Sequence, residues 1–190
     1  MKRRFCFTLV EILVVTALVA LLGAVGFAGY GYAMGAARRS ATESLIKQIE
    51  AALENFKIKK GYYPSSSSYM AVAFTVTGGA ITDVSFGGTA LGSDAFKVFI
   101  KPLDQEKLKK NLDGDVRVNG TYNLVDSWGG QIRYRYPGLV NTTGFDLIAP
   151  GPDGQFGVTP AADPADPPSA ATYKNGTDWA CDDIANFMDK

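Results

Sequence analysis

Residues 7–22 of the chain read FTLVEILVVTALVALL, and this stretch decides how the rest of the sequence is interpreted. The apolar run continues to Ala37, so residues 7–37 carry a single charge, Glu11. A helix of about 20 apolar residues is long enough to cross the hydrocarbon core of a membrane. The pattern therefore predicts a transmembrane helix over residues 7–37.

A short basic segment, residues 1–6, precedes this run and contains Lys2, Arg3 and Arg4. Positive charge beside a membrane helix keeps that end in the cytoplasm. An ordinary secretory signal peptide has an apolar core of about 7–15 residues, with the cleavage site behind it. Because this run is about twice that length, the sequence favours a retained helix over simple cleavage behind it.

Glu11 is the exception within the apolar run. A carboxylate at the bilayer centre costs on the order of 2.5–3.5 kcal/mol, so a buried Glu11 requires a partner. A Glu11 close to the cytoplasmic interface would instead reach water. Its position alone does not distinguish these two interpretations.

The helix is expected to continue to Lys60 with a different pattern. Apolar residues recur at three- and four-residue steps, which is typical of an amphipathic helix with one buried stripe. They are Leu45, Ile46, Ile49, Ala52, Leu53 and Phe56. Gly61 and Pro64 mark the end of the helix. Residues 38–190 therefore form a soluble domain, large enough for its own core.

Beyond the helix the pattern predicts mixed secondary structure. Residues 69–92 combine β-favouring side chains with the pairs Gly78-Gly79 and Gly87-Gly88, so short strands or an irregular excursion are expected. Helices are predicted at 94–100 and 104–112, the second capped by Asp104. Alternation over 132–136 and 145–149 predicts two antiparallel strands.

The composition argues against an enzyme and against nucleic-acid binding. The chain has 19 basic and 19 acidic residues, no histidine and two cysteines. Without histidine the usual catalytic triads and most catalytic zinc sites are excluded, and no other nucleophile–base pair is visible. No basic patch with interleaved aromatic residues appears, so no nucleic-acid partner is expected.

Several motifs together resemble the type IV pilin-like superfamily and, within it, the major pseudopilins of type II secretion. The basic leader followed by Phe7-Thr-Leu-Val-Glu11 resembles the prepilin processing and N-methylation motif, with Cys6 where glycine is usual. Four further motifs follow in the family's order. They are Gly61-Tyr-Tyr-Pro64, Asp126-Ser-Trp-Gly129 (Ser127 replacing the usual proline), Phe145-Asp-Leu147 with Gly151-Pro-Asp-Gly154, and Asp182-Asp-Ile-Ala-Asn-Phe187.

The resemblance implies an α+β pilin fold, in which a long N-terminal helix packs on a small antiparallel sheet with a C-terminal loop. It implies that a prepilin peptidase removes residues 1–6 by cutting between Cys6 and Phe7. It also implies that the new Phe7 amine is methylated, and that Glu11 pairs with this amine on a neighbouring subunit. A buried carboxylate is tolerated when an ammonium group meets it.

The implied function is that of a structural subunit of the type II secretion pseudopilus. Its expected partners are further copies of itself, minor pseudopilins, the inner-membrane assembly platform and membrane lipid. It would cross the inner membrane once, with the soluble domain in the periplasm. One alternative is a type IV pilus subunit serving adhesion, motility or DNA uptake. Another is a membrane-anchored binding domain with no role in a polymer.

The C-terminal region is acidic, with eight aspartates against two lysines from Asp146 to Lys190. Carboxylate and carbonyl oxygens are the ligands that Ca²⁺ prefers, although a solvated acidic tail would have the same composition. The resemblance implies a structural Ca²⁺ held by carboxylates of Asp153, Asp182 and Asp183 and by carbonyls of Pro150 and Gln155. Residues 156–181, rich in proline and alanine, separate the two halves of this set.

Overall fold

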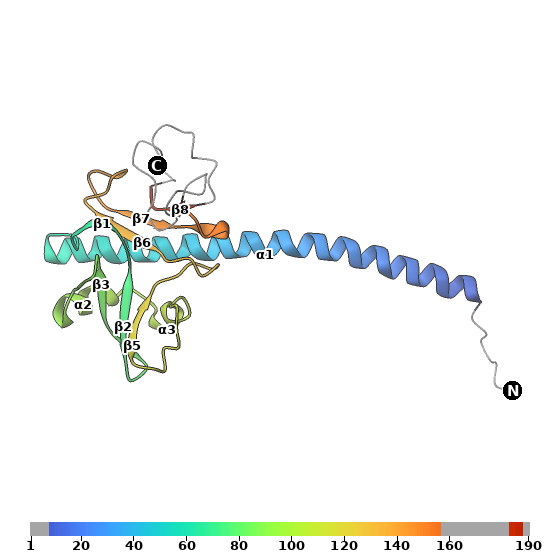
Figure 1. Cartoon of the computed structure of the whole chain (residues 1–190), viewed down its shortest axis with the longest axis horizontal. Coiled ribbons are helices and arrows are strands. Elements are labelled where there is room, and N and C mark those ends of the chain that lie inside the picture. Colours follow the sequence, from blue (N-terminus) through green and yellow to red (C-terminus); the bar gives the residue numbers. More distant parts are fainter. Residues whose placement is uncertain (1–7, 157–182, 188–190) are drawn as a thin grey trace. The chain divides into compact units, whose positions relative to one another are not determined.

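The computed structural model of the chain describes residues 8–156 and 183–187, and within the first helix it leaves out the side chains of residues 23–29. Internal contacts divide the chain into two compact units, Met1–Arg38 and Arg39–Lys190 (Figure 1). The described part combines helices with antiparallel sheets, which confirms the α+β class.

Helix α1 spans Leu9–Lys60, as the sequence predicted to within two residues. It ends where Gly61 adopts a positive φ of 84° and donates its N–H to the carbonyl of Lys57 at 2.7 Å. Lysines at positions 57, 59 and 60 occupy the last turn, where positive charge complements the helix dipole. Within the second unit the predicted apolar stripe from Leu45 to Phe56 is buried, so this part of α1 is amphipathic as expected.

The first sheet contains the two predicted strands. Its order is β1-β6-β7-β8, and every neighbouring pair is antiparallel. The strands span Ser66–Ala71 (β1), Arg133–Tyr136 (β6), Asp146–Ala149 (β7) and Ile184–Ala185 (β8). Strands β6 and β7 confirm the two antiparallel strands predicted over 132–136 and 145–149, although β7 is buried at all its positions instead of alternating.

A second four-stranded sheet corrects the expectation of one small sheet. Its order is β4-β3-β2-β5. The strands span Ala73–Thr77 (β2), Ala80–Phe86 (β3), Thr89–Ala90 (β4) and Gly120–Asn123 (β5). Both glycine pairs, 78–79 and 87–88, have positive φ angles of 59–76°, which suits two-residue hairpin turns. The glycines that made the region look irregular are therefore the turns between its strands.

Two short helices follow β4. Helix α2 spans Ser93–Ile100 and helix α3 spans Gln105–Lys109, so both predicted helices exist, the second ending earlier than expected. The Asp104 side chain caps α3 by accepting hydrogen bonds from the N–H groups of Glu106 and Lys107. The predicted cap is confirmed.

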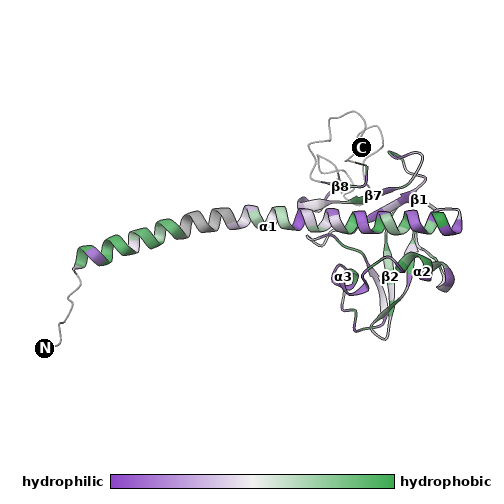
Figure 2. Ribbon diagram, turned by 180° about the vertical axis from the view of Figure 1, so that it is seen from behind, coloured by the Kyte–Doolittle hydropathy of each residue, from purple (hydrophilic) through white to green (hydrophobic). Residues whose placement is uncertain are grey.

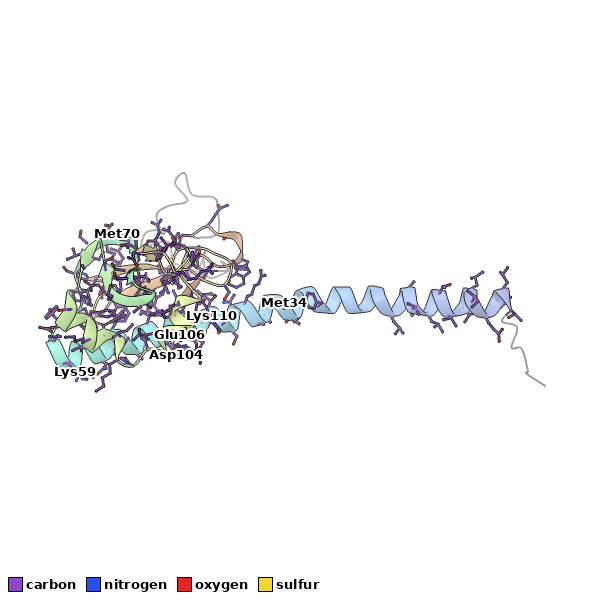
Figure 3. All side chains as sticks on the ribbon, turned by 90° about the horizontal axis from the view of Figure 1, so that it is seen from below. Met34, Lys59, Met70, Asp104, Glu106 and Lys110 are labelled. Carbon is purple, nitrogen blue, oxygen red and sulfur yellow. The ribbon has the colours of Figure 1, made fainter. Side chains whose placement is uncertain are left out.

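The core of the second unit lies where α1 meets both sheets, which Figure 1 draws on either side of the helix. It includes Ile49, Leu53 and Phe56 from α1. The rings of Phe86, from the second sheet, and Tyr134, from the first, pack edge to face with centroids 4.8 Å apart. Figure 3 shows side chains gathered around this part of the helix, with Met70 of β1 labelled and 42% exposed.

Candidate functional site

The first part of α1 exposes large apolar side chains on every side. The exposed fractions of the large apolar side chains within residues 9–22 run from 52% at Val14 to 79% at Leu9. Four consecutive residues, 12–15, are all exposed, and at about 100° per residue they surround the helix axis. Figure 2 shows the hydrophobic colouring of this segment. We call residues 9–22 the apolar segment.

The structure bears on the predicted membrane helix but does not describe the predicted processing site. Within the described part of the chain, no helix meets the combined length and apolarity that a membrane span requires. Cys6 and Phe7, where cleavage and methylation are predicted, lie outside the described residues.

Glu11 has a local role that sequence reasoning missed. Its carboxylate accepts hydrogen bonds from the backbone N–H of Thr8 at 2.7 Å and from the Thr8 hydroxyl at 2.8 Å. In return, the Thr8 hydroxyl accepts from the N–H of Glu11 at 3.2 Å. This reciprocal pattern is a capping box, whose Thr-x-x-Glu spacing is readable in the sequence. Glu11 therefore stabilises the start of α1 within its own chain.

The loop after β7 carries three of the predicted calcium ligands. Pro150 is buried and precedes the 3₁₀ helix η1, Gly151–Asp153. The Asp153 side chain is exposed, and its Oδ1 accepts from the N–H of Gln155 at 2.8 Å. Gly154 closes the turn with a left-handed φ of 72°. The loop thus presents an exposed carboxylate beside backbone carbonyls.

Asp183 is brought to the same end of the first sheet. It is fully buried and immediately precedes β8. Since Ala149 pairs with Ile184 in antiparallel register, the next position places Pro150 opposite Asp183. Asp182, the remaining predicted ligand, lies outside the described residues.

The predicted calcium set is assembled only in part. The strand register brings Pro150 and Asp183 together. All the predicted ligands would bind through oxygen atoms, which suits a hard cation such as Ca²⁺. No group of three or more acidic, cysteine or histidine side chains suited to a metal occurs among residues 8–156 and 183–187. Calcium binding therefore stays a prediction.

Asp146, one of the eight C-terminal aspartates, is an internal anchor. It is fully buried, and its carboxylate accepts from the Tyr69 hydroxyl at 2.7 Å. It also accepts from three consecutive backbone N–H groups, those of Leu139, Val140 and Asn141, at 2.6–3.0 Å. Burial and the hydrogen bond to Asp146 raise the pKa of Tyr69, so its hydroxyl remains a donor. The loop between β6 and β7 is held by this residue.

Asp126 is a third buried aspartate, 4% exposed, in the tryptophan-glycine turn. Its Oδ1 accepts from the N–H groups of Trp128 at 2.9 Å and Gly130 at 2.8 Å. Its Oδ2 accepts from the N–H of Gly151 at 3.1 Å. Asp126 therefore joins its own turn to the start of η1, which the sequence motif did not reveal.

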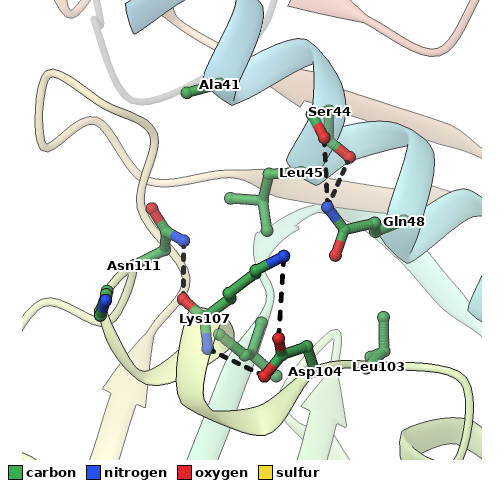
Figure 4. A pocket seen from close by; sticks show the side chains of 10 residues that line it. Ala41, Ser44, Leu45, Gln48, Leu103, Asp104, Lys107 and Asn111 are labelled. Atoms are coloured by element: carbon green, nitrogen blue, oxygen red, sulfur yellow. Dashed lines mark hydrogen bonds and ion pairs between the residues drawn. The ribbon is translucent and has the colours of Figure 1, made fainter.

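A hollow of about 320 Å³ lies between α1 and α3 (Figure 4). Leu45, Leu103 and Leu108 are among its apolar lining residues. Ser44 is partnered by Gln48, whose amide donates to the Ser44 carbonyl and hydroxyl at 3.2 Å. Lys107 Nζ lies 3.8 Å from Asp104 Oδ2. The polar groups of Ser44, Gln48, Asp104, Lys107 and Asn111 bond to near neighbours in the chain rather than being directed at a common point.

Comparison with known proteins finds no matching family model, no matching curated protein and no matching solved structure.

Proposed function

We propose that this chain is a pilin-like filament subunit of the type II secretion pseudopilus class, assembled through the apolar segment. The observation that carries the proposal is the exposure of large apolar side chains all around residues 9–22. The second unit, in contrast, buries most of its apolar residues in a core of its own. A helix that is apolar on all sides is stable only when something covers it.

Two kinds of cover suit the apolar segment at different stages. Before assembly, lipid would surround a single-pass helix in the inner membrane, with the soluble domain in the periplasm. After assembly, the corresponding helices of other copies would replace the lipid. Because the hydrophobic effect is not directional, the same surface serves both environments. Minor pseudopilins and the assembly platform are the further partners that this role requires.

Glu11 supports a polymer over a simple anchor. In a membrane-anchored binding domain Glu11 would serve only as the cap of its own helix, whereas a polymer also gives its charge a partner. In the proposed filament, prepilin peptidase cuts after Cys6, and the methylated Phe7 amine of a neighbour meets Glu11. The capping box with Thr8 would hold the carboxylate until that amine arrives, because it offsets part of the cost of an unpaired charge.

The small number of cysteines favours a secretion pseudopilin over a surface pilin. Surface pilins commonly close the C-terminal region with a disulfide loop. Once Cys6 leaves with the leader, Cys181 has no second cysteine in the chain. The proposed substitute is a structural Ca²⁺ held by Asp153, Asp182 and Asp183 with carbonyls of Pro150 and Gln155, which would tie the C-terminal loop down by oxygen coordination.

Two substitutions distinguish the role of the Glu11 charge from the role of Glu11 in capping helix α1. Glu11→Gln keeps a side-chain acceptor for Thr8 and removes the charge, whereas Glu11→Ala removes both. We expect both variants to insert in the membrane and neither to form filaments. Electron microscopy of the sheared fraction, from cells that also express the assembly machinery, measures filament number and length.

The matched control is Glu43→Gln. This residue also lies on α1 and is ion-paired with Arg39 at 3.1 Å, outside the apolar segment. It should leave filaments normal. Intact mass should show in every variant that the mature chain begins at methylated Phe7. Filaments of normal number and length from Glu11→Gln would contradict the proposed charge pairing.

A further inference from the structure

The turn at residues 126–130 contacts two distant parts of the second unit at once. The turn is closed by the N–H of Gly129, which donates to the carbonyl of Asp126 at 3.2 Å, and by the N–H of Asp126, which donates to Gly130 at 2.8 Å. The N–H groups of Trp128 and Gly130 also donate to the Asp126 carboxylate. The turn is thus rigidly held from inside.

On one side the turn is bonded to α1. The N–H of Ser127 donates to the hydroxyl of Thr42 at 3.1 Å, and the Thr42 hydroxyl donates to the Ser127 hydroxyl at 3.0 Å. Thr42 is 1% exposed and Ser127 is half-buried, so these bonds are shielded from water on the side of the helix. Residues 42 and 127 are 85 positions apart, which makes this a long-range tie between helix and turn.

On the other side the turn is bonded to the loop after β7. Asp126 Oδ2 accepts from the N–H of Gly151, and Gly151 and Pro150 are both buried. The backbone of Gly130 lies so close to Pro150 that a Cβ at Gly130 would overlap the proline ring. The turn and the loop therefore meet through a hydrogen bond and a tight packing contact.

We propose that the 126–130 turn is a brace that makes the position of the loop Pro150–Asp153 depend on helix α1, with Thr42 and Asp126 as its positioning residues. The chain of contacts runs from Thr42 to Ser127, then through Asp126 to Gly151. Buried polar groups linked in this way act as a unit, because loss of one member leaves the others without partners. The brace does not depend on whether the chain forms a filament.

The residue at position 127 decides whether the brace reaches α1. The backbone N–H of Ser127 is the donor to Thr42, and proline has no N–H. Proline is otherwise well suited to the second position of such a turn. Ser127→Pro should therefore keep the turn and lose the tie to α1, whereas Ser127→Ala keeps the N–H and loses only the hydroxyl.

The test is hydrogen–deuterium exchange of the full chain in detergent, read by mass spectrometry on peptides that cover residues 147–156. Thr42→Val removes the hydroxyl and nearly keeps the shape of the side chain. Although no hydrogen bond joins Thr42 to the loop directly, we expect exchange in 147–156 to rise on the order of tenfold, as for a local opening made about 1.4 kcal/mol easier. Thr42→Ser should restore slow exchange. Ser127→Pro and Asp126→Asn should resemble Thr42→Val.

Two controls separate the brace from general loss of stability. The peptide covering residues 139–144 belongs to the loop held by Asp146, and its exchange should not change. Asp113→Ala removes another turn aspartate, which accepts from the N–H of Asn123 at 2.7 Å, and should leave 147–156 unaffected. A rise confined to residues 126–130 in Thr42→Val would overturn the proposal. An equal rise in 139–144 would overturn it too.

Discussion

Buried aspartates fix the loops of the first sheet from within. Asp146 gathers four donors, one from the Tyr69 hydroxyl and three from backbone N–H groups of the β6–β7 loop. Gly138 packs against the same carboxylate so closely that a Cβ there would overlap it. The loop is therefore shaped around a single side chain, and its stability depends on that side chain's acceptor oxygens.

Substitution of Asp146 should be far more damaging than substitution of its tyrosine partner. Asp146→Ala leaves four donors without their acceptor and should lower the free energy of unfolding by at least about 3 kcal/mol. Tyr69→Phe removes one donor and should lower it by about 1 kcal/mol. Urea unfolding of the full chain in detergent, followed by tryptophan fluorescence, measures both. Equal losses from the two variants would contradict the anchoring role.

At the residue scale the sequence placed candidate ligands but did not separate their roles. All eight C-terminal aspartates looked alike, because burial and hydrogen-bond partners depend on strand register, which composition does not contain. Asp146 is an internal anchor, whereas Asp153 is exposed. The Thr8-x-x-Glu11 spacing, in contrast, is a local signature from which the capping box can be predicted.

Among the elements, the helices were the most predictable. Apolar residues at three- and four-residue steps, together with residues typical of helix ends, predicted α1, α2 and α3. Such patterns are readable because helix formation depends on local sequence. The second sheet was not predicted as a sheet. β2 and β3 form a hairpin across Gly78-Gly79, but the pairing of β2 with β5 joins residues far apart in the chain, and no local pattern reports that contact.

The cap of α3 can be tested against a helix that lacks one. Asp104 accepts from two backbone N–H groups at the start of α3, so Asp104→Ala should cost about 1 kcal/mol of unfolding free energy. Helix α2 starts after Gly92 with no side-chain cap, and its Asp94 is exposed. Asp94→Ala should therefore change stability by no more than about 0.5 kcal/mol. The same urea titration measures both, and equal effects would show that the cap contributes nothing.

At the scale of the whole molecule, calcium should act on stability through the C-terminal loop. A ligand that binds only the folded state adds about 2.7 kcal/mol when its concentration is a hundredfold above Kd. The melting temperature of the full chain in detergent should therefore rise with Ca²⁺ and fall with a chelator. Asp153→Ala should remove this response.

Asp115→Ala is the matched control for calcium. Asp115 is an exposed aspartate, ion-paired with Arg117 at 2.9 Å and outside the predicted ligand set. Hydrogen bonds from Arg117 lower the pKa of Asp115, so its carboxylate is ionised at neutral pH like a metal ligand would be. Its substitution should leave the calcium response intact. If a chelator does not change the melting temperature of the wild type, the loop does not bind calcium and is only a solvated acidic region.

The central claim is that the chain polymerises through its apolar segment, residues 9–22. Electron cryomicroscopy of filaments made from the full chain, with the prepilin peptidase and assembly machinery present, tests it most directly. We expect a helical array in which the apolar segments of neighbouring subunits pack together at the axis, with each Glu11 beside the Phe7 amine of another subunit. Filaments whose subunits meet only through residues 39–190, with the apolar segments left outside the contacts, would contradict the claim.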